Sequence, residues 1–271
     1  MLYNINRFRR YCMKPTPLFS RIETGTQTYD NVNRATYKGI GIKTGILLLI
    51  TILAALGVYL YVNYLALNID TITAEQLIPL IVGLVVAAIV SLICGIIGRF
   101  SDRLAVGCSI IYSVAEGVML GFITGIVDMA YPGLGVIAIF GTIIIFLIML
   151  VLFLTGVIKA GNTFRAIFLG IILGIVSLSL FTIVYFFASG IMGTINDNIF
   201  IALVIGIEAL LLLFGVISLT FNFMEAAQCV SSGASKASEW RVALGLEVSL
   251  IYIYIRLLRL LLFLAQFVNK K

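Results

Sequence analysis

Five ionisable side chains lie inside long apolar stretches of this sequence, and they are the residues best placed to do chemistry there. The acids are Glu116, Glu208 and Glu247, and the bases are Arg256 and Arg259. An ionised side chain near the centre of a bilayer costs about 2.5–3.5 kcal/mol on insertion scales. Unless they reach water, these five groups must therefore neutralise one another.

Helical spacing predicts three polar stripes, each on one face of a helix. The stripes are Ser109, Tyr112 and Glu116; Glu208, Gly215, Ser218 and Asn222; and Ser249, Tyr252, Arg256 and Arg259. Glu247 points roughly away from the last stripe. Three facing stripes indicate a polar interior in which Glu116 and Glu208 neutralise the two arginines. Either this interior is an ion or proton pathway gated when a pair breaks, or the pairs are permanent and fix the register of the last helix.

The composition shows that the elements holding these stripes lie in lipid. The 271 residues are 62% hydrophobic and only 11% charged, whereas a soluble domain has about 25% charged residues. A bilayer-spanning helix needs about 20 apolar residues. We therefore predict an all-α integral membrane protein with seven transmembrane helices. The predicted segments are 44–69, 76–98, 104–127, 129–158, 166–196, 199–222 and 241–268.

The positive charges predict the orientation, because cytoplasmic loops are enriched in Lys and Arg. Eight of the 18 Lys and Arg residues precede residue 44, and placing them inside puts fourteen of the 18 in the cytoplasm. The predicted organisation is a basic cytoplasmic tail over residues 1–43, a membrane domain over 44–268 and a short tail over 269–271. Lys270 and Lys271 would then lie outside, so the last segment is either a full span or a re-entrant one.

The basic tail has two interpretations. Its aromatic and basic cluster, from Tyr3 to Tyr11, is suited to anionic lipid or to another membrane protein. Alternatively, the tail is a solvated orientation signal. We do not expect it to bind nucleic acid.

Several classes of chemistry are excluded by what the sequence lacks. It has no histidine, which removes Ser-His triads and H-E-x-x-H zinc sites. Its four cysteines have no C-x-x-C spacing, and it has no phosphate-binding loop. We expect no enzyme activity, no cofactor and no metal centre.

Glycines and turns predict how the helices pack and connect. Gly117, Gly121 and Gly125 repeat every four residues, which lets helix backbones approach closely. Pro132-Gly133 predicts an external turn, and residues 231–235 predict a flexible loop before the last helix.

The order and spacing of several short motifs resemble the Bax inhibitor-1/YccA family of membrane proteins, in particular its longer bacterial branch. The resemblance runs from Ala35 onward. The matching stretches are Tyr112 to Gly117 with Leu120-Gly121, Tyr131-Pro132-Gly133, Phe164-Arg165, Glu239-Trp240, Gly245-Leu246 and Tyr252 to Leu261.

The resemblance implies a seven-helix fold with helix seven central and six helices around it, in a bacterial plasma membrane. It also implies a pH-sensitive calcium leak in some members, ascribed to two acids that share a proton, and modulation of a membrane-bound protease in others. This sequence has Thr220, with Asn222 nearby, and Arg256 where those acids are expected. Calcium binding is therefore doubtful, because a fixed positive charge repels calcium.

Two functions follow as expectations. The first is an ion (calcium or proton) leak or sensor whose polar core is modified by Arg256. The second is a regulator of a membrane-bound protease or another membrane complex that transports nothing itself.

Overall fold

The computed structural model describes residues 34–67, 74–154 and 197–269, together with short helical stretches between residues 171 and 183. Its six long helices are α2 (Tyr37–Leu67), α3 (Ala74–Phe100), α4 (Ala105–Ala130), α5 (Leu134–Leu154), α7 (Asp197–Ser231) and α8 (Ser238–Asn269). All six are long and apolar enough to cross a membrane. The prediction of an all-helical membrane protein is confirmed for the described residues. Most of the predicted span 166–196 lies outside them, as does nearly all of the basic tail.

The two helix ends that differ most from the sequence prediction are the start of α2 and the end of α7. α2 begins at Tyr37, so Lys38 and Lys43 lie in its first two turns rather than in the tail. α7 continues to Ser231, beyond the predicted end at residue 222, and therefore includes Glu225. Both extensions carry charges, which a search for charge-free stretches necessarily leaves out.

The predicted connections are confirmed where the structure describes them. Gly133 has a φ of 88° in the short turn between α4 and α5, and Gly233 has a φ of 68° between α7 and α8. This left-handed backbone conformation favours glycine. The backbone N–H of Ala35 donates a hydrogen bond to the carbonyl of Ala234 at 2.8 Å, which ties the start of α2 to the α7–α8 loop.

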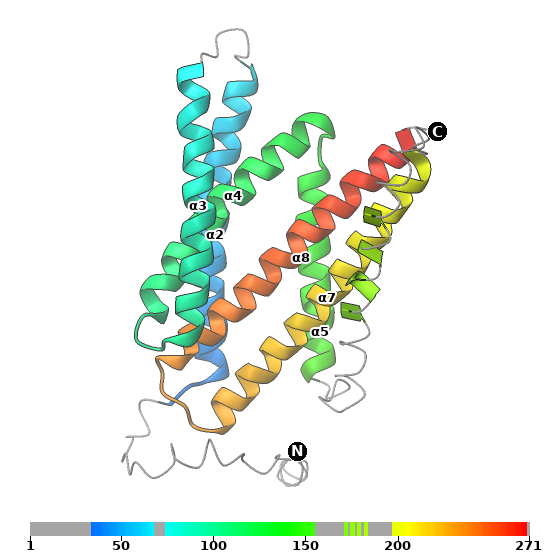
Figure 1. The fold of residues 1–271 in the computed structure, drawn as a ribbon. Helices are drawn as coiled ribbons and strands as arrows, with labels where there is room; N and C mark the ends of the chain where they lie inside the picture. The colour runs from blue at the N-terminus through cyan, green and yellow to red at the C-terminus, as the bar shows by residue number, and fades with distance from the viewer. Residues whose placement is uncertain are drawn as a thin grey trace. The chain divides into compact units, whose positions relative to one another are not determined.

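Helix α8 contacts each of the other five long helices. In Figure 1 it runs diagonally, in orange to red, with α2, α3 and α4 on one side and α5 and α7 on the other. Its side chains Val242, Leu244, Ile253 and Leu258 are almost completely buried. These side chains belong to two apolar clusters, one shared mainly with α7 and the other with α4 and α5. Any polar group on α8 is therefore within reach of several helices.

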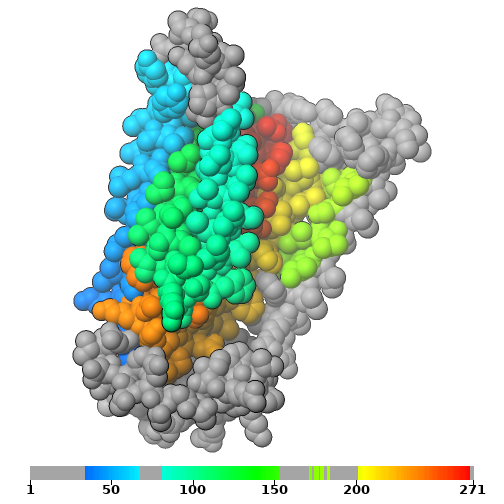
Figure 2. Space-filling view, turned by 60° about the vertical axis from the view of Figure 1, so that its left-hand side comes forward, coloured from blue at the N-terminus to red at the C-terminus, as the bar shows by residue number. Residues whose placement is uncertain are grey.

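Helices α2, α3 and α4 lie side by side on one face of the molecule (Figure 2), and many of their large apolar side chains are exposed. Leu49, Leu53, Leu92, Ile93 and Val114 are exposed on these helices. In water such a surface would be unstable, whereas lipid tails are as apolar as leucine.

The three glycines of α4 lie against α2, as their spacing predicts. A Cβ on Gly117 would lie 2.6 Å from the Cβ of Ala54, and one on Gly121 would lie 2.9 Å from the Cβ of Val58. A Cβ on Gly125 would lie 2.9 Å from Val62. The backbones of α2 and α4 therefore approach more closely than any larger residue permits.

We predict that Gly121→Ala destabilises the protein by about 1–3 kcal/mol, the usual range for overpacking. The added methyl group would meet the backbone carbonyl of Ala55, which cannot rotate away. Gly57→Ala is the matched control, because nothing lies within 4 Å of a Cβ at Gly57. Thermal unfolding in detergent measures both, and equal stabilities would contradict the close approach.

Candidate functional site

Glu208 on α7 forms ion pairs with two arginines of α8. Its Oε2 lies 3.3 Å from Nη1 of Arg256, and its Oε1 lies 3.5 Å from Nη1 of Arg259. The Glu208 side chain is 7% exposed, whereas Arg256 is 21% and Arg259 is 53% exposed. The expected pairing of Glu208 with the α8 arginines is therefore found, with the acid buried and the bases directed outward.

Aromatic rings of α7 and α8 hold Arg256 in place. Its guanidinium carbon lies 4.9 Å from the centroid of the Tyr252 ring, a cation–π contact. The Tyr252 ring meets Phe214 edge-on at 6.1 Å. Gly215 makes room for the tyrosine, since a Cβ there would lie 2.7 Å from Cδ1 of Tyr252. Four predicted site residues thus belong to one cluster: Glu208, Tyr252, Arg256 and Arg259.

Thr220 and Asn222 lie farther along α7, away from this cluster. Asn222 donates from Nδ2 to Oγ of Ser249 at 2.5 Å, and it accepts from Nη2 of Arg99 at 2.9 Å. Thr220 is buried and its hydroxyl donates within α7 to the Val216 carbonyl at 3.4 Å. Twelve residues separate Glu208 from Thr220, about 18 Å of helix. The structure therefore does not bring Thr220 and Arg256 together.

Glu116 also lies away from the arginines, on the side of α8 that faces α2, α3 and α4. Its carboxylate accepts hydrogen bonds from Tyr112 and from Ser91. Glu247 of α8 lies near it and near Ser113. The sequence predicted that Tyr112 and Glu116 share a face and that Glu247 points away from the arginine stripe, and both features are found. The spacing of residues along single helices did not predict that Glu116 and Glu247 would be neighbours.

A third group of charges lies at the C-terminal ends of α3 and α7 and at the N-terminal end of α8. Arg99 pairs with Glu225 at 3.2 Å, and Arg241 pairs with Asp102 at 3.2 Å and with Glu225 at 3.8 Å. Ser238 donates to Asp102 at 3.3 Å. These pairs join three helices at one end of the bundle.

The comparison with family models decides which family this fold belongs to. The model for Bax inhibitor 1 like proteins matches residues 16–266, nearly the whole chain. The chain belongs to the Bax inhibitor 1 like family. Searches of curated proteins and of solved structures found no match.

This Bax inhibitor 1 like protein shows no group of three or more Cys, Asp or Glu side chains able to hold a metal ion within the residues that the structure describes. Its intramembrane carboxylates instead occur as one acid with two arginines and as two neighbouring acids. The arrangement is suited to exchanging ion-pair partners or protons rather than to holding a resident metal.

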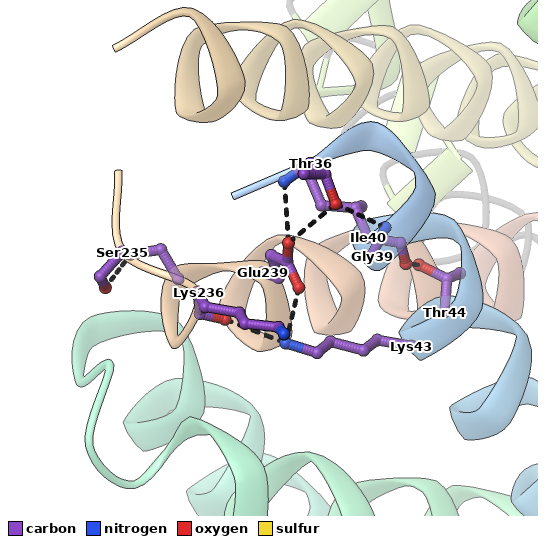
Figure 3. Close-up of polar contacts among 9 residues, drawn as sticks. Thr36, Gly39, Ile40, Lys43, Thr44, Ser235, Lys236 and Glu239 are labelled. Atoms are coloured by element: carbon purple, nitrogen blue, oxygen red, sulfur yellow. Dashed lines mark hydrogen bonds and ion pairs between the residues drawn. The ribbon is translucent and has the colours of Figure 1, made fainter. Parts of the chain in front are cut away.

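One buried pair in this family member was not predicted from the sequence. Glu239, fully buried in the first turn of α8, lies 2.8 Å from Nζ of Lys43 on α2 and accepts a hydrogen bond from the backbone N–H of Thr36 (Figure 3). Lys43 also donates to the carbonyl of Lys236 at 2.9 Å and lies 5.1 Å from the centroid of the Trp240 ring. The only signal in the sequence was the Glu239-Trp240 dipeptide, which does not name its partner.

We predict that Lys43→Met lowers stability by about 3–5 kcal/mol, because Glu239 is left buried without an ion-pair partner. Lys38→Met is the matched control, since Lys38 is exposed on the same helix. Thermal unfolding in detergent compares the two variants. If they lose the same stability, the Lys43–Glu239 pair does not hold α2 to α8.

Proposed function

We propose that this protein passes or senses ions across the membrane, with the cluster of Glu208, Arg256 and Arg259 acting as its gate. The observation that supports the proposal most strongly is the buried carboxylate of Glu208 between two arginines inside predicted spans. Ionisable residues inside transmembrane segments usually mark ion or proton pathways. Membership of the Bax inhibitor 1 like family agrees with this function.

The charge of the cluster determines which ions it favours. One carboxylate and two guanidinium groups have a net charge of +1 when all are ionised, and arginine stays protonated at any physiological pH. A calcium ion approaching the cluster meets a positive field. In the closed state we therefore propose little passage of calcium at neutral pH, with opening limited by separation of Glu208 from its arginines.

The proposal includes the finer arrangement expected from the sequence. In this arrangement the protein has seven membrane spans around a central α8, with the N-terminal tail in the cytoplasm of a bacterial cell. The contacts of α8 with five other helices support its central place. The basic residues before residue 44 support the orientation.

A second candidate function is a regulator that transports nothing and engages anionic lipid or another membrane protein through its basic tail. The six Lys and Arg residues that precede α2 favour it. In that case the pairs of Glu208 with the arginines are permanent and serve only to fix the register of α7 and α8.

We predict that purified protein in liposomes leaks little calcium at pH 7, and that Arg256→Asp raises the calcium flux several-fold. The substitution replaces the positive charge nearest Glu208 with a second carboxylate, which attracts divalent cations. Flux is measured with a calcium-sensitive dye trapped in the liposomes.

The matched control is Arg103→Asp, the same change of charge at an exposed position between α3 and α4. It should leave the flux at the wild-type level. A high flux in the wild-type protein would contradict the proposed gate. An unchanged flux in Arg256→Asp would favour permanent pairs and the second candidate function.

A further inference from the structure

Glu247 is the most deeply buried carboxylate within the apolar part of α8. Its side chain is fully buried; Oε1 accepts a hydrogen bond from the hydroxyl of Thr51 on α2 at 2.8 Å, and the hydroxyl of Ser113 on α4 is also close to the carboxylate. Its other oxygen, Oε2, is buried and has no hydrogen-bond partner. A buried carboxylate oxygen without a donor is costly if the group is ionised.

No positive charge faces Glu247 from the helices packed around it, as far as the structure describes them. α2 has no charged residue between Thr44 and Leu67, α3 has none between Gln76 and Gly98, and α5 has none at all. α4 contributes Glu116 and the phenol of Tyr112, and both groups are close enough to interact with Glu247 or with one another. Among the described residues, the charge that acts on Glu247 is therefore the second carboxylate, Glu116; the guanidinium of Arg99 reaches Gly245, two residues away, but is paired with Glu225.

Apart from Lys38, which is exposed at the start of α2, the cations of the surrounding helices are paired with other acids as far as the structure describes them. Lys43 pairs with Glu239, Arg99 and Arg241 pair with Glu225, and Arg256 and Arg259 pair with Glu208 on α7. A fully buried carboxylate that lacks a cation, as Glu247 does, must gain either a proton or a metal ion. A calcium ion needs six to eight oxygen ligands, and no group of three acidic or cysteine ligands occurs in the described part of the chain. The ligand that fits is a proton.

We propose that Glu247 is a proton-binding site, with the proton held on Oε2 while Oε1 accepts from Thr51. The proton comes from solution and forms an O–H bond with the carboxylate, which leaves Glu247 neutral. Glu116 is only partly buried, and it accepts hydrogen bonds from Tyr112 and Ser91 that favour its ionised form. The site is separate from the Glu208 cluster and does not depend on whether the protein conducts ions.

The position of Glu247 gives this proton a structural effect. Loss of the proton would place an unscreened negative charge on Glu247 beside Glu116, at the junction of α8 with α2 and α4. The Glu247 side chain is fully buried, so bulk water does not reach that charge. Deprotonation of Glu247 would therefore loosen α8 from α2 and α4.

Infrared difference spectroscopy of the protein in lipid tests the site directly, because a protonated carboxylic acid has its own C=O stretching band. We expect the wild-type protein to show such a band, shifted by exchange into D₂O, and Glu247→Gln to lose it. Glu239→Gln is the matched control. Glu239 is equally buried on the same helix but is paired with Lys43, so its substitution should leave the band intact.

Two further results keep the proposal open to refutation. Thr51→Val, which removes the hydrogen bond to Oε1, should shift the frequency of the band without removing it, and this variant decides the question if Glu247→Gln does not fold. A band that is absent from the wild type, or that survives in Glu247→Gln, overturns the proposal. So does a change in the carboxylate bands on adding calcium or sodium that Glu247→Gln abolishes, because it would make the ligand a metal ion.

Discussion

The cost of placing a charge in lipid is the constraint on which the rest of this structure depends. A carboxylate or guanidinium group on α8 is stable inside the membrane only if it is paired with an opposite charge on another helix, is neutralised by a proton, or reaches water. Four of the five charged residues on the described part of α8 have an ion-pair partner on another element, and Glu247 alone has none. The pairs are Glu239 with Lys43, Arg241 with Asp102 and Glu225, and Arg256 and Arg259 with Glu208.

These pairs also specify how the helices are arranged. Lipid tails are as apolar as leucine, so burying leucines between helices does little to select one register over another. An ion pair or a glycine contact is specific, because it forms at only one position along the helix. Glu208 fixes α8 against α7, Lys43 fixes it against α2, and Gly121 sets the spacing of α2 and α4.

The sequence predicted those features that depend on one helix at a time. Charge-free stretches located the spans, four-residue spacing identified the glycines of α4, and the stripe on α8 placed Arg256 beside Tyr252. The partner of Glu116 could not be predicted, since periodicity tells which face a residue occupies and not which helix meets that face. Lys43 and Glu239 are separated by nearly two hundred residues, and no local pattern connects them. Whether Thr220 lies beside Arg256 depends on the register of α7 against α8, and the sequence of a single helix does not determine that register.

The central claim is that the charges inside the membrane are neutralised by specific partners on other helices. A double-mutant cycle on Glu208 and Arg256 tests it most directly, with Glu208→Gln, Arg256→Gln and the double variant compared by reversible unfolding in lipid or detergent. The account predicts a coupling free energy of about 0.5–3 kcal/mol, so that the double variant loses less stability than the sum of the single variants. Losses that add to within about 0.3–0.5 kcal/mol would contradict it, because the two charges would then be neutralised independently of each other.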